Sequence, residues 1–169
     1  MNLNFVDGYA QQWATLGCLV ASALLVGALF FEHVLALPPC PLCMMQRVWF
    51  FLAAALAWVS LVHNPRWGIY PVLILLMTVI GAYFSIRQLW LQSLPEDQVP
   101  ACGPDLQYMI DVLPMSDVLS AMTSGTGDCA KTAWSFLGIT LPGWALIGFV
   151  TVAACAFMQL REGILAGKR

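Results

Sequence analysis

The chain has 169 residues, of which 60% are hydrophobic and only 9% are charged, and its formal net charge is −2. Its mean hydropathy is +0.79. Soluble domains contain roughly 25% charged residues, so this composition excludes an ordinary soluble protein. The sequence predicts an integral membrane protein, and we expect no nucleic-acid partner.

Four apolar stretches dominate the sequence, at residues 13–31, 44–62, 70–91 and 143–160. A helix needs about 20 residues to cross the hydrocarbon core of a bilayer, and the second stretch reaches that length if it begins near Cys43. The connections between the stretches leave no room for a separate soluble core. The sequence therefore predicts an all-α protein with one domain, residues 1–169, built as a four-helix transmembrane bundle.

Basic residues indicate how this bundle is oriented. Four of them share a side with the N-terminus and two lie on the other side. The four are Arg66, Arg161, Lys168 and Arg169, and the two are Arg47 and Lys131. Because positive charge is retained in the cytoplasm, both termini are expected there, with the loops at about residues 32–43 and 92–142 outside. Residues 1–12 contain no Lys or Arg, so the first stretch is expected to be a retained span and not a signal peptide.

The first outer loop contains two cysteines three residues apart, within the stretch Pro38–Arg47. Prolines precede Cys43 and no helix breaker follows it for about twenty residues, so a helix is predicted to begin at or near this cysteine. The partial positive charge at a helix N-terminus favours a thiolate, and Arg47 lies on the same helical face as Cys43. Cys40 and Cys43 are therefore predicted to be redox-active. The alternative is a structural disulfide or half of a zinc site.

The second outer loop holds another pair of cysteines, Cys102 and Cys129, which are 27 residues apart. An outer compartment permits disulfides, and this wide spacing does not suit a zinc site, so no metal is expected. The flanks that carry the two cysteines, residues 99–104 and 124–131, are rich in turn residues and are predicted to be exposed and mobile. By spacing alone, an ordinary loop disulfide is the simpler interpretation.

Between these flanks, apolar residues recur at steps of three and four from Leu106 to Met122. The pattern is typical of amphipathic helices, and one or two short helices are predicted to rest at the membrane surface. The remaining cysteines, Cys18 and Cys155, lie inside apolar stretches. A thiol in such a position is expected to pack as a small hydrophobic group.

Further motifs surround the four loop cysteines. They are Glu32-His33, Pro39-Cys40-Pro41-Leu42-Cys43 followed by Arg47, Cys102 in a Pro-flanked turn, Gly127-Asp128-Cys129, Trp134, Phe136-Leu137-Gly138 and Pro142-Gly143-Trp144. With these motifs the chain resembles, over nearly its whole length, the DsbB family of bacterial inner-membrane proteins that reoxidise the periplasmic thiol oxidase DsbA. Some members have an ionisable residue such as His beside the quinone near the end of the third span. Gln92 and Ser93 stand there in this chain, so no titratable group is carried over.

The resemblance implies a quinone-dependent enzyme that generates protein disulfides. In such an enzyme Cys102 and Cys129 oxidise a DsbA-like periplasmic thioredoxin-fold partner, and Cys102 forms the mixed disulfide. Electrons then pass to Cys40 and Cys43 through a Cys40–Cys129 bridge, which frees the Cys43 thiolate beside ubiquinone or menaquinone. The expected catalytic residues are thus the four loop cysteines and Arg47, and the expected quinone-binding residues are Cys43 and Arg47.

Two other functions stay open on the sequence. The chain could be a carrier that delivers reducing equivalents outward, although a carrier is expected to place cysteines within its spans. It could also be a four-span scaffold whose loop disulfides are purely structural. An interfacial anchor is the alternative role for Arg47, and the sequence assigns no role to Arg87, Trp134 or Trp144.

Overall fold

Four long helices form the body of the structure, a computed structural model that describes residues 3–64, 68–103 and 106–167. They are α1 (Leu3–His33), α2 (Pro41–His63), α3 (Ile69–Gln92) and α6 (Leu141–Gly167). Each contains an apolar segment long enough to cross a bilayer, and each predicted span lies within one of these segments. The predicted all-α class with four spanning helices is confirmed. Four residues considered above lie outside the described residues: Arg66, Pro104, Lys168 and Arg169.

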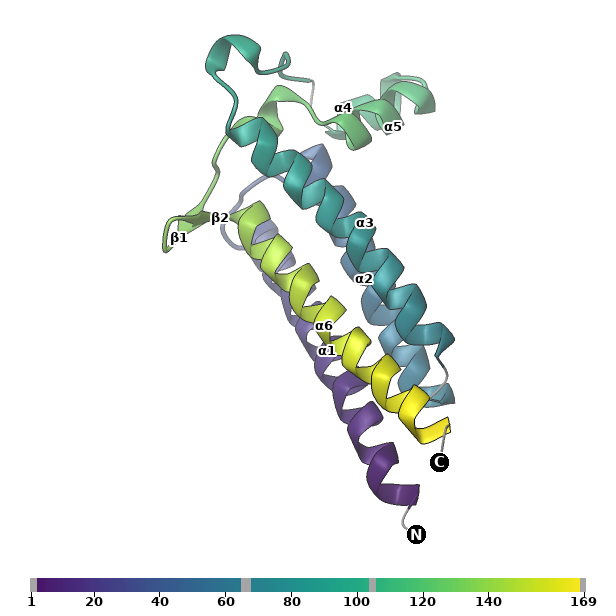
Figure 1. Cartoon of the computed structure of the whole chain (residues 1–169). Coiled ribbons are helices and arrows are strands. Elements are labelled where there is room, and N and C mark those ends of the chain that lie inside the picture. The colour runs from purple at the N-terminus through teal and green to yellow at the C-terminus, as the bar shows by residue number, and fades with distance from the viewer. Residues whose placement is uncertain (1–2, 65–67, 104–105, 168–169) are drawn as a thin grey trace.

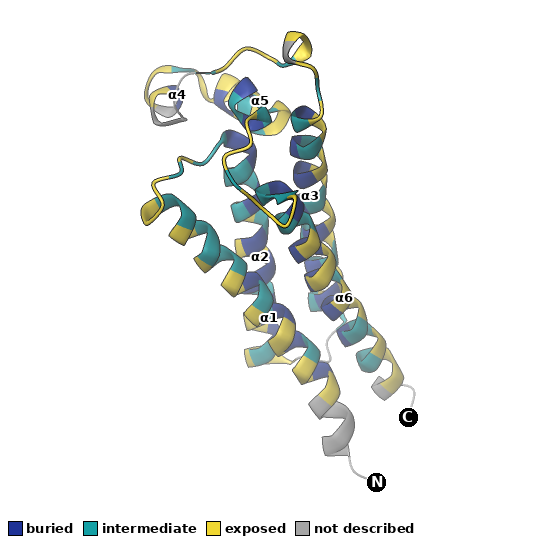
Figure 2. Ribbon diagram, turned by 90° about the vertical axis from the view of Figure 1, so that its left-hand side faces the viewer, coloured by how far each residue is buried: buried dark blue, intermediate teal, exposed yellow. Residues whose placement is uncertain are grey.

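The four helices pack in a ring, in which α1 and α3 each contact both α2 and α6. Both termini lie at one end of the bundle, and the short helices and a β-hairpin lie at the other end (Figure 1). Buried residues follow the sides on which the helices meet (Figure 2), and large apolar side chains such as Leu19, Val79 and Val150 are exposed. An outer surface of this kind suits contact with lipid tails, which are as apolar as the side chains themselves.

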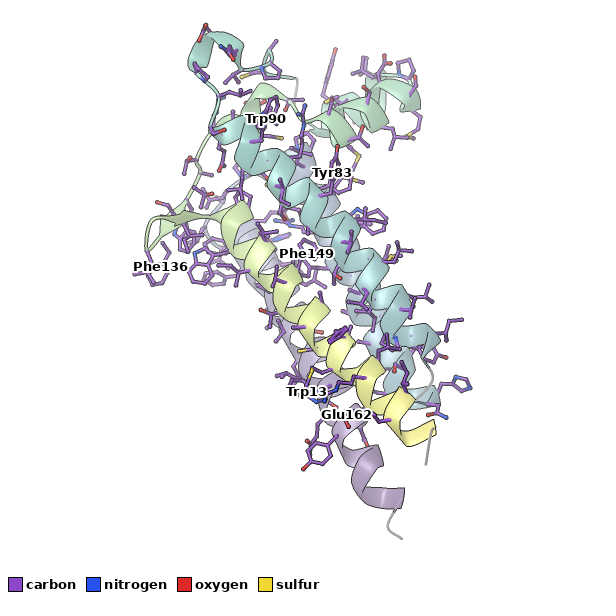
Figure 3. The ribbon with its side chains drawn as sticks, in the orientation of Figure 1. Trp13, Tyr83, Trp90, Phe136, Phe149 and Glu162 are labelled. Carbon is purple, nitrogen blue, oxygen red and sulfur yellow. The ribbon has the colours of Figure 1, made fainter. Side chains whose placement is uncertain are left out.

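Close approach of the helices depends on small residues. The ring of Phe50 in α2 stacks on that of Phe149 in α6, with centroids 3.7 Å apart. Phe149 lies between α6 and α3 (Figure 3), and a Cβ added at Gly81 of α3 would be 2.3 Å from its ring. Nearer the termini, Gln159 Nε2 of α6 donates a hydrogen bond to Ser60 Oγ of α2 at 2.8 Å. Tight packing and buried hydrogen bonds are the forces that join helices in a membrane.

Helix α2 begins at Pro41, two residues before the predicted start at Cys43. Proline is tolerated at the first helical position because the N–H that it lacks would have no acceptor within the helix. Cys40 is the N-cap residue, and its Sγ accepts a hydrogen bond from the N–H of Cys43 at 3.4 Å. The helix therefore begins near Cys43, as predicted, but Pro41 does not exclude helix before this cysteine, and Cys43 lies in the first turn of α2.

The second outer loop contains the short helices that the amphipathic spacing predicts. They are α4 (Leu106–Val112) and α5 (Met115–Ser124). Two 3-10 helices lie in the same loop: η1 (Glu96–Gln98) precedes the first flank, and η2 (Gly127–Ala130) lies within the second. Helix α5 packs against α2 and buries Val118, so the loop covers the end of the bundle where α2 begins.

The loop ends in a β-hairpin that the sequence did not predict. Its strands are β1 (Ser135–Phe136) and β2 (Ile139–Thr140), paired antiparallel. The turn residues Leu137 and Gly138 have φ angles of 53° and 77°, as the tight turns of two-residue hairpins require. Strands of two residues are too short to show the alternation by which a strand is recognised. The hairpin leads directly into α6 (Figure 3), and the ring centroid of Phe136 lies 6.2 Å from that of Trp144 in α6.

Candidate functional site

Cys40 and Cys43 lie side by side where the first loop enters α2. Their Sγ atoms are 2.7 Å apart, and both cysteines are free. The capping contact between Cys40 Sγ and the Cys43 N–H fixes both residues in one turn of backbone. A Cys-x-x-Cys pair held in this way can interconvert between dithiol and disulfide with little movement of the chain.

A buried glutamine of α3 faces both sulfurs. Gln88 Nε2 lies 3.3 Å from Cys40 Sγ and 3.3 Å from Cys43 Sγ. Gln88 Oε1 accepts a hydrogen bond from Gln46 Nε2 of α2 at 2.8 Å. Neither glutamine can be identified from the sequence, because one amide in an apolar span gives no pattern that separates a functional residue from one that joins helices.

Cys129 belongs to the second loop but lies against the first. Its side chain is fully buried in a cluster with Leu42, Phe84 and Leu91, against which Cys40 packs. Hydrogen bonding with the Cys40 thiol is the main reason that the pKa of Cys129 falls from 9.0 to about 6, in spite of its burial. The Cys40 thiol lies between the sulfurs of Cys129 and Cys43, and its pKa is raised by both contacts and by burial.

The burial of Cys129 follows from contact between the two flanks of the second loop. The N–H of Gly127 donates to the carbonyl oxygen of Ala101 at 3.1 Å. A Cβ at Gly127 would lie 2.3 Å from the carbonyl oxygen of Pro100, so only glycine allows this approach. Gly127, Cys129 and Thr126 are buried, and the prediction that this flank is exposed is wrong. Turn-rich composition indicates the absence of regular structure and does not by itself indicate contact with solvent.

Cys102 on the opposite flank is exposed, as predicted. The carboxylate of Asp128 lies beside it. Lys131 Nζ is 2.7 Å from Asp128 Oδ1, and the pKa of Asp128 is lowered chiefly by hydrogen bonding with Lys131 and further by a hydrogen bond with Cys102. Asp128 thus contacts the exposed Cys102, whereas the next residue in the chain, Cys129, is buried.

Arg47 lies in the second turn of α2, and its side chain reaches toward α1. It forms an ion pair with Glu32 and donates from Nη2 to the carbonyl oxygen of Ala28 at 3.0 Å. Nη1 also lies 3.8 Å from Met44 Sδ. The shared helical face predicted for Arg47 and Cys43 does bring both residues to one pocket. However, the nearest charge to the guanidinium in the described contacts is the carboxylate of Glu32.

The pocket has a volume of about 600 Å³ and lies among α1, α2, α3, α6 and the two outer loops. Its walls are mainly apolar, with a few polar and sulfur-bearing side chains. The lining includes Cys40, Cys43, Gln46, Arg47, Gln88 and Trp134. This size and composition are typical of sites for organic molecules, which occupy roughly 300–1,000 Å³. The structure therefore joins the Cys40–Cys43 pair to a cavity that can hold such a molecule.

Trp134 and Trp144, to which the sequence assigned no role, lie at the pocket. Trp134 packs on Phe31 of α1, with centroids 4.8 Å apart, and both Trp134 and Trp144 line the pocket. Trp144 Nε1 donates to the carbonyl oxygen of Phe136 at 3.3 Å, which joins α6 to the hairpin.

Arg87 of α3 has a separate, structural set of contacts. Its Nε donates to the carbonyl oxygen of Ser124 at 3.2 Å, and its guanidinium lies 4.3 Å from the ring centre of Trp90. Arg87 therefore holds the end of α5 against α3. Away from the loops, Cys155 is buried in the bundle and Cys18 packs against the helix core, in line with the packing role predicted for both.

Comparison with known proteins identifies the family. The model of disulfide bond formation protein DsbB matches residues 10–159. The chain belongs to the DsbB family. Disulfide bond formation protein B of Hahella chejuensis is 48% identical over 150 residues, which cover 86% of this chain and 91% of the relative. The protein of the same name from Marinobacter nauticus is 45% identical over 148 residues, 85% and 88% of the two chains. That of Nitrosococcus oceani is 43% identical over 157 residues, 90% and 93%.

No solved structure matches the chain. Membership of the DsbB family and the four long apolar helices make this chain a multi-pass membrane protein. The family resemblance seen in the sequence is thereby confirmed. The relatives are named for disulfide bond formation, which is the chemistry that clustered free cysteines can carry out.

Proposed function

We propose that this DsbB-family protein is a membrane protein-dithiol:quinone oxidoreductase, which reoxidises a DsbA-like periplasmic thioredoxin-fold protein. One observation carries the proposal. Cys129 of the second loop lies against Cys40 of the first, and Cys40 is paired with Cys43 at the edge of the pocket. Two structural disulfides would have no reason to share a sulfur-to-sulfur contact between loops.

The exchange begins at the exposed cysteine. With Cys102 and Cys129 joined, a thiolate of the partner attacks Cys102, the Cys102–Cys129 bond breaks, and Cys129 leaves as a thiolate. Thiols of low pKa leave fastest, and backbone hydrogen bonds with Leu42 and Thr126, which do not depend on the Cys40 thiol, lower the pKa of Cys129 and suit it to this role. The second partner thiolate then displaces Cys102, which releases the partner as a disulfide.

The two electrons then move inward by disulfide exchange among the four cysteines, so the number of disulfide bonds in the chain does not change in this stage. The Cys129 thiolate attacks Cys40, the Cys40–Cys43 bond breaks, a Cys40–Cys129 bond forms, and Cys43 leaves as a thiolate. Attack by Cys102 on Cys129 restores the Cys102–Cys129 bond and frees Cys40. The pair in α2 is then reduced, and the partner's two electrons reside on Cys40 and Cys43.

The pocket fits a quinone as the final acceptor. Its mainly apolar walls suit a quinone ring, Arg47 and Cys43 would lie beside the bound ring, and Trp134 and Trp144 line the same space. When bound, ubiquinone or menaquinone supplies a two-electron oxidant that returns the dithiol to a disulfide and leaves as the quinol. The side chains of this chain orient the sulfurs and offset negative charge near Cys43.

The proposed location follows from the charge bias of the flanking residues. Both termini would lie in the cytoplasm of a bacterial inner membrane, and both cysteine loops in the periplasm. Exposed Cys102 is then the point at which a soluble partner is reached. An outward carrier of reducing equivalents is less well supported, because the paired cysteines belong to the start of α2 and to the second outer loop, and these segments share one end of the bundle (Figure 1).

The experiment uses purified protein in detergent or nanodiscs, a reduced thioredoxin-fold partner and a water-soluble quinone analogue. We expect the quinone to be reduced only when the partner is present, one quinone for each partner disulfide formed. Cys102→Ser and Cys43→Ser should both abolish the reaction. A scaffold would leave the quinone oxidised, and a reductant carrier would reduce the partner at the expense of another donor; either result overturns the proposal.

A further inference from the structure

We propose that Gln88 is a positioning residue of the redox site, whose side-chain amide holds the Cys43 sulfur as a thiolate when Cys40 is bridged to Cys129. The thiolate state belongs to the proposed function and rests on it. The contact between Gln88 and the two sulfurs is a feature of the structure itself.

A hydrogen bond with Gln46 fixes the orientation of the Gln88 side-chain amide. Gln46 Nε2 donates to Gln88 Oε1 at 2.8 Å, which places Gln88 Nε2 on the side of the sulfurs. Oε1 also lies 3.6 Å from Cys43 Sγ and accepts from its thiol, a contact that is lost when Cys43 is a thiolate. Nε2 is 3.3 Å from each sulfur of the Cys40–Cys43 pair. An amide nitrogen carries two hydrogens and can donate to both sulfurs at once. Gln88 is only 3% exposed and Gln46 only 6%, so water does not compete for these hydrogens.

The Cys40 thiol lies 2.7 Å from Cys43 Sγ, but once Cys40 is bridged to Cys129 it has no hydrogen to donate, and this amide is then the main side-chain donor to Cys43. In the described part of the chain, the hydrogen bonds of Arg47 go to Glu32, Ala28 and Met44. The Glu32 carboxylate offsets the positive charge of the guanidinium. A thiolate removed from water needs hydrogen-bond donors, and hydrogen bonds to a charged acceptor are about twice as strong as those between neutral groups.

The geometry suits the step in which the Cys40–Cys43 bond breaks. As Cys129 attacks Cys40, the electron pair of the breaking bond moves to Cys43, which leaves as a thiolate. Gln88 already contacts both sulfurs of that bond, so negative charge develops on an atom that faces an N–H group before the bond breaks. A donor fixed in advance stabilises developing charge without a further cost of reorganisation.

The test measures Cys43 by itself, without quinone. In protein with Cys40, Cys102 and Cys129 replaced by serine, the labelling rate of Cys43 by a small maleimide is followed from pH 5 to pH 10 by mass spectrometry. We expect Gln88→Met, which keeps the size of the side chain but removes the donor, to move the midpoint to higher pH. Labelling at pH 7 should fall roughly tenfold, as expected for loss of a hydrogen bond to a charged group.

A matched control separates this effect from loss of a buried amide in general. Gln159 is also a buried glutamine and donates to Ser60 between α2 and α6, toward the other end of the bundle. Gln159→Met should leave the midpoint of Cys43 labelling unchanged. A shift of equal size in Gln159→Met would show a general loosening of the bundle and would overturn the assignment.

A second variant keeps the test decisive if Gln88→Met folds poorly. Gln88→Glu preserves the shape and still accepts from Gln46, but an ionised carboxylate repels the thiolate, so the midpoint should move higher still. An unchanged midpoint in a folded Gln88 variant rules out the positioning role. Because the labelling uses no quinone and no partner, failure of quinone reduction in the wild-type protein would refute the proposed function and leave this measurement valid.

Discussion

Glu32 changes what Arg47 can contribute to the neighbouring thiol. Spacing along α2 places Arg47 and Cys43 on one face, but spacing says nothing about the last two turns of α1, which supply the Glu32 carboxylate and the Ala28 carbonyl. A paired guanidinium costs less to bury than a lone one, since the ion pair and hydrogen bond replace its lost hydration. Arg47 nevertheless lines the pocket, so its proposed role toward the quinone stands as a prediction.

Arg47→Gln should weaken the apparent affinity for quinone and slow turnover. The expected loss is one to two orders of magnitude, which corresponds to about 1.4 to 2.8 kcal/mol of lost interaction. Arg47→Lys should retain more activity, because it keeps the charge but not the forked geometry that pairs with a carboxylate. Quinone reduction over a range of quinone concentrations measures both effects.

The control for this prediction is Arg161→Gln. Arg161 is exposed and lies in α6 near its C-terminal end, far from the pocket. The variant removes the same charge without touching the pocket and should leave the kinetics unchanged. Wild-type kinetics in Arg47→Gln itself would identify Arg47 as an interfacial anchor.

The pH dependence of Cys129 is a second prediction at this scale. The pKa of this thiol is lowered to about 6, so the thiolate predominates above that pH and is lost as the pH falls below it. In a Cys102→Ser variant, labelling of Cys129 at pH 5 should therefore be about tenfold slower than on the plateau above pH 7. Mass spectrometry after timed alkylation of the reduced protein provides the profile.

Cys40→Ala in the same background removes the hydrogen bond that contributes most to the lowered pKa. The midpoint of the labelling profile should then move to higher pH. A midpoint that stays where it was would mean that the backbone donors around Cys129 suffice, and that contact between the loops does not tune this thiol.

Packing between α3 and α6 depends on a single missing side chain. Gly81→Ala would place a Cβ 2.3 Å from the ring of Phe149, which is itself stacked on Phe50. Forcing an extra carbon into a packed core costs about 1–3 kcal/mol, because the rings must shift or the helices must separate. We expect a lower midpoint in unfolding by denaturant in mixed micelles, with unfolding followed by tryptophan fluorescence.

Gly27→Ala is the matched control for this helix contact. A Cβ at Gly27 of α1 would meet nothing within 4 Å, so the variant should be as stable as the wild type. It could even be more stable, since alanine favours a helix over glycine by about 1 kcal/mol. Equal destabilisation by both substitutions would show that glycine matters here for helix flexibility and not for space.

The elements of this fold differ in how far the sequence determines them. The spanning helices were predictable because lipid requires long apolar helices, and composition alone reports that requirement. The start of α2 was predicted only to within two residues because Pro41 was interpreted as a helix breaker, whereas it occupies the first helical position, which tolerates proline. The hairpin at Ser135–Thr140 gave no periodic signal, although its Phe136-Leu137-Gly138 segment is among the family motifs.

At the scale of the whole molecule, the fold exposes one of the four site cysteines to solvent and shields the other three wholly or partly. Cys102 is exposed, whereas Cys129 is buried against Cys40. Cys129→Ser should therefore trap the partner, because Cys102 can still form a mixed disulfide but the route inward is missing. A band on non-reducing gels that contains both proteins and disappears on reduction is the expected result.

The trap has an internal control in Cys102→Ser. This variant keeps the buried Cys129 thiol but lacks the exposed attack point, so it should give no mixed disulfide. If Cys102→Ser captured the partner as efficiently, a whole protein, and not only a small alkylating reagent, would have to reach Cys129, contrary to its burial.

How the site is assembled was only partly predictable. The four cysteines could be identified from their spacing and from the side of the membrane on which they lie. Their contacts could not, because the position of Cys129 depends on the Gly127–Ala101 hydrogen bond between segments 26 residues apart. Gln88 lies on a helix distant in sequence from Cys40, and no local pattern connects the two.

The enclosed position of Cys129 also determines which competing reactions can occur. A thiolate generated next to its target reacts as though the target were present at an effective molarity far above any dissolved concentration, up to about 10⁵–10⁸ M when the geometry is ideal. Under the proposed function, Cys129 would therefore react with Cys40 before a small thiol from the surrounding solution does. Electrons would enter at Cys102, the exposed sulfur, and reach the pocket through sulfurs that are shielded from solvent.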